Sequence, residues 1–403
     1  MIEFKCEHET LAKMPSIKVV GVGGAGGNTV NSLIDSGCQN VYCIAANSDA
    51  QALELSHAQQ TIQLGVKSTK GLGTGANPDL GRHAAEEDLD KIMESLSDAD
   101  IVFLTAGMGG GTGSGALPVI ARALKKEGIL TIAIVTKPFT FEGKRRSAIA
   151  EEAIAKLKPE VDSLIVIPNQ RLLEIVDANV SMMQAFSIIN DMLGQAVRGI
   201  ADIIIKPGYI NVDFADVKAV MYNMGMSLMG TGRATGEDRA LTAALNAISS
   251  PLLEDLHMQG ARGVLLNISG GSSMRLHEIN EAASVIYEQA AEDAHIILGA
   301  VIDEQLGEEL VVTVIATGFE TREEIAPQMQ EPAHVQPAVK EQPNLTSVQT
   351  KEVENKTCEK SESDNAAVKN EPSVRTTTLV SKEDLLDVPT FLRRQEGQQA
   401  KSE

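Results

Sequence analysis

Two glycine-rich turns, each placed directly after an apolar run, are the strongest constraint in this sequence. GVGGAGGN, residues 21–28, follows the run IKVV, and GMGGGTGSG, residues 107–115, follows the run DIVFLTA. Six of the nine residues in the second turn are Gly. Such a density costs conformational entropy at every position, but it lets the backbone approach a ligand closely. Because backbone N–H groups at a helix start attract anions, the two turns together predict a site for one polyphosphate.

Short apolar runs alternate with helical stretches over the first half of the chain. The runs are IKVVGVG, VYCIAAN, DIVFLTAG, ILTIAIVT and DSLIVIPN. Continuous apolar strands separated by helices are typical of a parallel sheet that is covered on both faces. The pattern therefore predicts an α/β domain that extends to about residue 178.

A long helix is predicted over residues 181–206. Its apolar residues recur at intervals of three and four, namely Phe186, Ile189, Leu193, Val197, Ile200 and Ile204. Pro207-Gly208 ends the helix, because proline cannot continue the backbone hydrogen bonding. Beyond this point helical stretches alternate with GVLLNIS, AHIILGAVID and ELVVTVIATG. They predict a second α/β domain.

The composition changes abruptly after this second domain. Of 34 Gly, 33 lie at or before Gly318, and residues 322–380 contain no Gly, Phe, Tyr or Trp. Such a segment buries too little apolar surface to offset its chain entropy. We therefore predict a flexible N-terminus over 1–14, a nucleotide-binding domain over 15–180, a central helix over 181–206, a second α/β domain over 207–318, a disordered linker over 319–380 and a partner-binding peptide over 381–403.

Composition and charge exclude several classes of protein. The net charge is −20, Trp is absent and Phe plus Tyr total 12. This balance lacks the basic and aromatic residues of a nucleic-acid surface. Four distant Cys without a CxxC pair fit a reducing compartment. There is no signal-peptide pattern, and no apolar run has the roughly 18 residues of a membrane span, so we expect a cytoplasmic protein.

The first turn alone leaves two kinds of nucleotide site open. Gly21, Gly23 and Gly26 match GxGxxG, and Asp49 follows the next strand, as in dinucleotide-binding proteins. An NAD-dependent oxidoreductase is therefore one alternative, although the seven His are scattered. No GxxxxGK[ST] motif occurs, so no P-loop lysine neutralises a triphosphate. Backbone dipoles and a divalent cation must then do so, and Mg²⁺ is the expected cation.

Longer motifs carry a resemblance to a known family. GGGTGSG resembles the signature of the tubulin/FtsZ family of GTPases. The segments NSDAQAL, GLGTGANP, TKPFTFEGKRR, NVDFADV, TGEDRA and SSPLLED resemble its bacterial cell-division members. The resemblance covers about residues 17–318 and resumes at LDVPTFLRRQ.

The resemblance implies a tubulin-like fold and a GTPase that polymerises with GTP and forms the cytokinetic ring, or Z ring, at the division site. The first domain would bind GTP or GDP, the second would activate hydrolysis, and K⁺ is a candidate cation beside Mg²⁺. No protein side chain is assigned to a metal. The implied nucleotide-binding residues are Gly24, Ala25, Gly26, Gly27, Asn28, Asn47, Asp49, Gly75, Ala76, Asn77, Gly111, Thr112, Gly113, Glu142, Arg146, Phe186 and Asn190.

Phe186 and Asn190 lie four residues apart, on one face of the long helix. The resemblance implies that Phe186 stacks on the guanine and that Asn190 hydrogen-bonds its edge. From the residues alone, Phe186 is an ordinary core aromatic. The two interpretations differ in whether the ring packs against the protein or against the base.

The segment NVDFADV supplies three polar residues, Asn211, Asp213 and Asp216. From the residues alone, Asp213 suits a helix N-cap and Asp216 is a solvated acid. The resemblance implies that this loop of one subunit completes the nucleotide site of the next and positions the attacking water. Such a contact is head to tail and gives an open filament. A scaffold that assembles without hydrolysis is a further alternative.

The C-terminal peptide concentrates apolar residues beside two arginines. The resemblance implies that it binds membrane-tethering division proteins of the FtsA and ZipA type, which would place the filament at midcell on the inner face of the membrane. Arg393 and Arg394 beside Phe391 would also suit direct contact with anionic lipid. The proposed partner-binding residues are Leu385, Leu386, Asp387, Val388, Pro389, Phe391, Leu392 and Arg393.

Overall fold

The computed structural model describes residues 15–38, 41–175, 180–206, 208–210, 212–250 and 260–319. The predicted flexible N-terminus, nearly all of the predicted linker, the partner-binding peptide and Asn211 lie outside these residues. Among the residues described, no helix has the length and apolarity that crossing a membrane requires.

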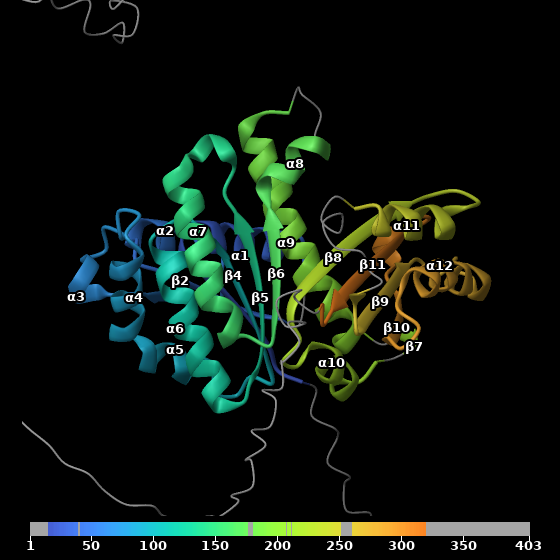
Figure 1. Ribbon diagram of the computed structural model, residues 1–403, viewed down its shortest axis with the longest axis horizontal. Coiled ribbons are helices and arrows are strands. Elements are labelled where there is room, and N and C mark those ends of the chain that lie inside the picture. The colour runs from blue at the N-terminus through green and yellow to red at the C-terminus, as the bar shows by residue number, and fades with distance from the viewer. Residues whose placement is uncertain are drawn as a thin grey trace, which may run out of the picture. The chain divides into compact units, whose positions relative to one another are not determined.

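Eleven strands form one sheet (Figure 1). In spatial order they are β3 (Gln60–Gln63), β2 (Tyr42–Asn47), β1 (Ile17–Val22), β4 (Ile101–Gly107), β5 (Leu130–Lys137), β6 (Ser163–Pro168), β8 (Gly225–Ala234), β11 (Leu310–Thr317), β9 (Gly263–Gly270), β10 (His295–Ile302) and β7 (Gly208–Ile210). The strands from β3 to β6 are all parallel. The predicted α/β class with a parallel N-terminal sheet is confirmed.

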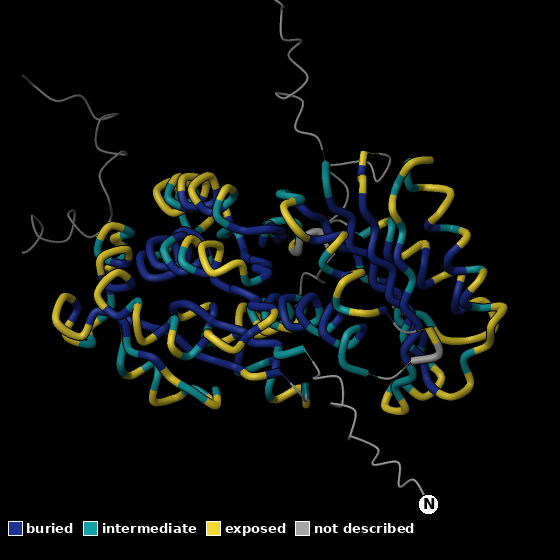
Figure 2. The backbone as a smooth tube through the Cα atoms, turned by 90° about the horizontal axis from the view of Figure 1, so that it is seen from below, coloured by how far each residue is buried: buried dark blue, intermediate teal, exposed yellow. Residues whose placement is uncertain are grey.

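Helices cover both faces of this sheet. They are α1 (Gly23–Asp35), α2 (Ala50–Glu54), α3 (Val66–Thr69), α4 (Pro78–Glu87), α5 (Leu89–Leu96), α6 (Thr112–Glu127), α7 (Lys144–Leu157), α8 (Asn169–Ile175), α9 (Met182–Ile205), α10 (Phe214–Met221), α11 (Arg239–Ile248) and α12 (Leu276–Gln289), with short 3-10 turns η1 (Thr140–Glu142), η2 (Lys158–Glu160) and η4 (Glu304–Leu306). Figure 2 shows the buried residues concentrated on the strands and on the inner sides of the helices.

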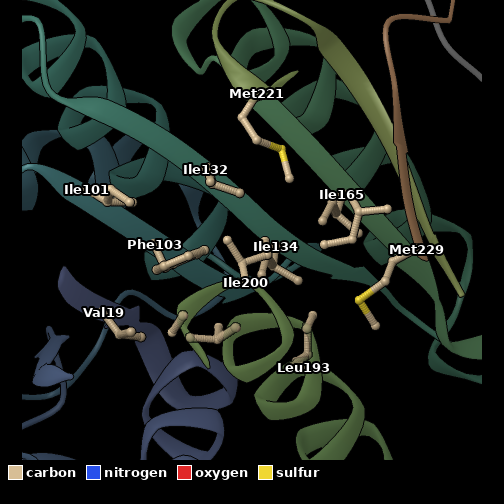
Figure 3. Packing of buried hydrophobic residues seen from close by; sticks show 14 of the residues in the cluster. Val19, Ile101, Phe103, Ile132, Ile134, Ile165, Leu193, Ile200, Met221 and Met229 are labelled. Carbon is tan, nitrogen blue, oxygen red and sulfur yellow. The ribbon is translucent and has the colours of Figure 1, made fainter. Parts of the chain in front are cut away.

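Alternate residues of the buried strands belong to different cores. On β4, Ile101 and Phe103 pack on the side of α1, α9 and α10, while Val102 and Leu104 pack on the side of α4 to α7. This alternation is the two-residue period of a strand buried on both faces. Figure 3 shows Phe103 and Ile134 close to Ile200 of α9. A third core lies between α11, α12 and the strands of the second half.

The helix α9 corresponds to the predicted helix over 181–206. Its N-cap is Ser181, whose Oγ accepts from the Gln184 N–H at 3.3 Å, while the Ser181 N–H donates to Gln184 Oε1 at 2.9 Å. Near the other end Ile203 is fully buried, whereas Ile204, which the spacing favours, is only partly buried. The 24 residues of α9 span about 36 Å.

The two halves of the sheet meet between β6 and β8. Ser163, Leu164 and Ile165 of β6 pair in parallel with Gly225, Met226 and Ser227 of β8. In the second half β11 runs antiparallel to both of its neighbours, and β7 runs antiparallel to β10. The strands on either side of α9 are therefore hydrogen-bonded into one continuous sheet.

Candidate nucleotide site

The first glycine turn joins β1 directly to α1. A Cβ on Gly26 would lie 2.5 Å from the Thr105 carbonyl oxygen, and one on Gly21 would lie 2.2 Å from the Gly26 carbonyl oxygen. These two glycines let the turn pack against the sheet. Around Gly24 and Gly27, in contrast, a Cβ would meet nothing within 4 Å. The predicted binding stretch 24–28 thus divides into a packed residue, Gly26, and residues with an open side.

The second glycine turn joins β4 to α6 and packs against a third segment, residues 74–78. A Cβ on Gly111 would lie 2.2 Å from Thr74 Oγ1, and one on Gly115 would lie 2.0 Å from the Pro78 carbonyl oxygen. Gly109 has a φ of +96°, which L-residues with side chains rarely adopt. Only around Gly110 is the Cβ position of this turn open.

The hydroxyl groups of the second turn serve the protein itself. Thr112 Oγ1 lies 2.6 Å from Ser48 Oγ and 3.2 Å from Thr74 Oγ1, and all three hydroxyls are buried. Ser114 Oγ accepts from the Gly109 N–H at 2.9 Å. Thr112 therefore offers a ligand its backbone N–H, one of the helix-start donors that lack an intrahelical acceptor. This cluster ties three loops together and is not predictable from the spacing of the motifs.

The two glycine turns lie side by side, because β1 and β4 are adjacent and parallel. A Cβ on Gly23 would lie 3.2 Å from the Gly113 N, and one on Gly107 would lie 2.7 Å from Ala25 Cβ. The N-termini of α1 and α6 therefore open at the same edge of the sheet. Two helix dipoles then point their positive ends at one region of space.

Three of the predicted polar residues cap or follow nearby elements. Asp49 Oδ1 accepts from the Gln51 N–H at 3.0 Å at the start of α2, and Asn77 Oδ1 accepts from the Asp79 N–H at 3.0 Å at the start of α4. Asn47 Oδ1 accepts from the Asp49 N–H at 3.3 Å. Between these caps, Gly75 and Ala76 have φ values of +56° and +58°. The structure thus gives these polar side chains local roles at the rim of the site.

A cavity of about 130 Å³ lies beside the first glycine turn. It is lined by Gly24, Gly27 and Asn28 of the turn, by Asn47 of β2, and by Asn31. Asn31 was not among the predicted residues, and its Oδ1 accepts from the His57 N–H at 2.8 Å. It lies three residues after Asn28, so helical spacing alone places both on one face of α1.

Aromatic rings and an ion pair border the second turn. The Phe186 ring is half-buried and packs edge to face on Phe139, with the ring centroids 5.6 Å apart, and Phe139 stacks on the exposed Phe141 at 4.9 Å. Arg146 forms an ion pair with Glu142, and its carbonyl oxygen would lie 2.8 Å from a Cβ on Gly109. The structure thus places Arg146 against the second glycine turn, with Glu142 paired to it, and Phe186 against Phe139. Half-buried Asn190 lies one helical turn after Phe186.

The two acids lie on α10, where they form a capping box. The Asp216 N–H donates to Asp213 Oδ1 at 2.8 Å, and the Asp213 N–H donates to Asp216 Oδ2 at 3.4 Å. Both residues are exposed. The N-cap role of Asp213 that the residues suggest is therefore present, and both carboxylates stand at one helix start.

The acids and the glycine turns lie at opposite edges of the parallel sheet. The last residue of α10, Met221, accepts through its carbonyl oxygen from Ser163 Oγ at 3.2 Å, and Ser163 begins β6. The glycine turns, in contrast, follow the ends of β1 and β4. Along α9, which runs from the side of α8 towards α10 (Figure 1), Phe186 and Ile205 are separated by about 29 Å. One chain therefore cannot bring its own acids to its own glycine turns.

Comparison with known proteins gives two adjacent family matches. Residues 16–177 match the GTPase domain of the Tubulin/FtsZ family, and residues 225–320 match the C-terminal domain of the FtsZ family. The structure of an empty FtsZ dimer from M. jannaschii is 43% identical, with a TM-score of 0.73, and the match covers 76% of this chain and 89% of that one. The chain belongs to the FtsZ family.

Further FtsZ-like structures share the fold. A tyrosine-for-tryptophan mutant of the M. jannaschii FtsZ matches at 43% identity and a TM-score of 0.73, over 76% of this chain and 92% of that one. CetZ2 from Haloferax volcanii, solved as a protofilament with GTPγS, matches at 21% identity and a TM-score of 0.65, over 76% of this chain and 93% of that one. The tubulin-like fold expected from the motifs is confirmed.

FtsZ-family membership establishes the chemistry of the site in outline. The chain is a polymerising GTPase that binds GTP and GDP and associates with itself. The NAD-dependent oxidoreductase and the scaffold without hydrolysis are thereby excluded. The match of GxGxxG at the first turn reflects a requirement for close backbone packing that both kinds of nucleotide site share.

Proposed function

We propose that the chain assembles head to tail and hydrolyses GTP between successive subunits, and that the filament is the cytokinetic ring of a dividing cell. The observation that carries the proposal is the separation of Asp213 and Asp216 from the glycine turns by the length of α9. A second subunit stacked on the first brings its acids to the first subunit's nucleotide. An open filament follows, because the contact is head to tail, and the filament always keeps unused glycine turns at one end and unused acids at the other.

The glycine turns hold the phosphates in this proposal. Gly24, Gly27 and Gly110 leave the Cβ positions open, so that phosphate oxygens approach the backbone N–H groups of both helix starts. The guanine lies against Phe186, whose ring is only half-buried, with Asn190 at its edge. Asn47, Asp49 and the segment Gly75, Ala76, Asn77 close the rim.

The residues at the site fit a nucleotide that binds together with its cation. Among the described residues, no three His, Cys, Asp or Glu side chains gather into a metal site. Mg²⁺ would be held mainly by phosphate oxygens and water, and K⁺ is a candidate for a second cation. When bound, Mg²⁺ offsets phosphate charge that this chain, without a P-loop lysine, leaves to backbone dipoles.

The acids complete the neighbouring site by positioning water. Asp213 and Asp216 are exposed at the start of α10 and so can face a second molecule. Phosphoryl transfer needs charge stabilisation and an aligned water, and two carboxylates supply only the alignment. Asn211 is proposed to assist them.

The C-terminal peptide is proposed as the attachment point. Its cluster of apolar residues beside Arg393 fits a groove on a membrane-tethering division protein of the FtsA or ZipA type. Such tethering would hold the cytoplasmic filament at midcell on the inner face of the membrane. Direct contact with anionic lipid is the competing arrangement, and binding of the peptide to lipid vesicles alone would favour it.

The test is GTP turnover measured against protein concentration. A site completed by the next subunit predicts negligible turnover per subunit below a threshold concentration and a steep rise above it. Light scattering on the same samples should rise at the same threshold. Turnover strictly proportional to protein concentration, starting from the lowest concentration, would contradict the proposal.

A further inference from the structure

Lys206, at the C-terminal end of α9, bridges two carboxylates from different parts of the molecule. Its Nζ lies 2.9 Å from Asp202 Oδ2, one turn earlier on α9, and 2.9 Å from Asp303 Oδ2, between β10 and η4. Burial by itself would lower the Lys206 pKa, but hydrogen bonds to both carboxylates outweigh it and raise that pKa. The ammonium group is therefore charged whenever the neighbouring acids are ionised.

Asp303 is a fixed anchor for this lysine. Its backbone N–H donates to the Gly270 carbonyl oxygen at 2.9 Å, and its Oδ1 accepts from the Gln305 N–H at 3.0 Å. Burial opposes ionisation of Asp303, but the hydrogen bonds from Lys206 and from the Gln305 N–H, together with the charges of Lys206 and Arg198, outweigh burial and lower the Asp303 pKa. Through Asp303, the end of α9 is attached to the turn that follows β10.

The chain that leaves α9 runs along this same anchor. β7 begins two residues after Lys206 and pairs with β10, where Ile210 faces Ala300 and Gly208 faces Val301. Val212 is then buried in the core beside α9. Asp213 and Asp216 follow at once, on the capping box of α10. Lys206 and Asp303 therefore hold the end of α9 against the turn after β10, which is the strand that pairs with β7, the segment leading to the two acids.

The end of α9 has one face in the core and one face beside a cavity. A cavity of about 300 Å³ lies next to it, lined by Cys38, Arg198, Asp202, Lys206 and Asp303. The core face of this helix end is packed, because Ile203 is buried and Ile204 and Ile205 pack against the same core. On the face that borders the cavity, ion pairs and hydrogen bonds supply the contacts. Arg198 is the other cation of this cavity, and its Nη2 donates to Ser36 Oγ on the side of α1.

We propose that Lys206 is a positioning residue for GTP hydrolysis, which acts by holding the acids of its own subunit in register for the nucleotide of the next. The inference rests on the proposed function, because the acids matter only if they complete a neighbouring site. It assigns to Lys206 no contact with GTP. The nucleotide affinity of the subunit that carries Lys206 is therefore independent of it.

Lys206→Met removes the charge and keeps the stem of the side chain. Turnover per subunit at saturating protein concentration should fall about tenfold, because small displacements of groups that orient a reactant are costly. GTP affinity should stay within about twofold of the parent value, and Lys206→Arg, which can still bridge both carboxylates, should restore most of the turnover. Lys156→Met, which breaks the exposed pair with Glu152 on α7, is the matched control and should change nothing.

Mixing two defective subunits separates positioning from general damage. Gly24→Asp places a carboxylate where phosphate binds, in a position with no atom within 4 Å, so this variant folds but does not bind GTP. The Gly24→Asp subunit keeps the acid loop, that is, Asp213 and Asp216. Added to Lys206→Met, it should raise turnover well above the sum of the two variants alone, because it lends its acids to the GTP of the Lys206→Met subunit.

A mixture of Gly24→Asp with Asp216→Asn distinguishes failure of the inference from failure of the proposed function. If the Asp216→Asn mixture gains turnover and the Lys206→Met mixture does not, Lys206 does not act through the acid loop and the inference is overturned. If neither mixture gains, completion of the site in trans is itself wrong. If Lys206→Met does not fold, Asp303→Asn, which removes the other partner, takes its place with the same expectation.

Discussion

The edge of the sheet where the glycine turns lie, here the nucleotide edge, is tightly packed. A Cβ on Gly26, Gly111 or Gly115 would lie between 2.0 and 2.5 Å from an oxygen atom of the protein. At the opposite edge, here the acid edge, Asp213 and Asp216 are exposed side chains held by a capping box. In the proposed site, one half is thus shaped by missing side chains and close backbone contact, and the other by exposed side chains and polar contacts. Substitution of the packed glycines at the first edge should therefore damage the fold, and substitution of the acids at the second should damage turnover.

The largest expected effect lies within the second glycine turn, between a packed glycine and an open one. Gly115→Ala forces a Cβ to within 2.0 Å of the Pro78 carbonyl oxygen, so α4 and α6 must move apart. We expect the free energy of unfolding to fall by about 3 kcal/mol. Gly110→Ala, whose Cβ meets nothing within 4 Å, should leave it nearly unchanged. The urea midpoints of the two variants measure the difference, and equal midpoints would show that the turn is not held by packing.

At the acid edge, substitutions should change the rate of GTP turnover and not the stability of the fold. Asp216→Asn keeps the size of the side chain and a hydrogen-bond acceptor for the capping box, but it removes the charge. Turnover in the assembled state should fall about a hundredfold, as when other groups that act on a transition state are removed. The urea midpoint and GTP affinity should not change.

Asp238→Asn is the matched control for this substitution. Asp238 is also an exposed aspartate at the start of a helix, α11, and it makes no side-chain cap hydrogen bond. The same loss of charge there should leave turnover at the parent value. A comparable loss in both variants would mean that net charge, rather than the place of Asp216, controls the rate.

The two edges also differ in how much of them the sequence predicts. Strand periodicity and capping are local, so β1, β4, α9 and the N-cap at Asp213 follow from short-range patterns. The buried hydroxyl cluster of Ser48, Thr74 and Thr112 does not, because it joins three loops that are remote in sequence. The same holds for the pairing of β6 with β8. The roles proposed for Phe186 and the acids rest on the family resemblance and not on periodicity.

Charge is the second physical contrast between the two halves. On the nucleotide side, the pair of Lys156 with Glu152 is exposed, with more than 60% of each side chain accessible. In the second half, Arg239 and Glu278 form a pair with only 5% and 12% of their side chains accessible, and Arg239 also donates to the Glu308 carbonyl oxygen at 2.7 Å. Only the second pair is shielded from water and salt.

The smallest expected effect is a pH dependence of the unfolding free energy that is caused by Glu278. The hydrogen bond from Arg239 lowers the Glu278 pKa in the folded protein below its ordinary value of 4.5. A carboxylate with a lowered pKa stabilises the fold above its unfolded-state pKa, and this stabilisation is lost as the pH falls through the folded-state pKa. The parent should therefore exceed Glu278→Gln in unfolding free energy by about 1 kcal/mol near pH 7. This difference in unfolding free energy should shrink below pH 4.5. The exposed control Glu152→Gln should differ little from the parent at any pH. A difference for Glu278→Gln that stays constant between pH 7 and pH 3 would mean that the pair contributes through shape and not through charge.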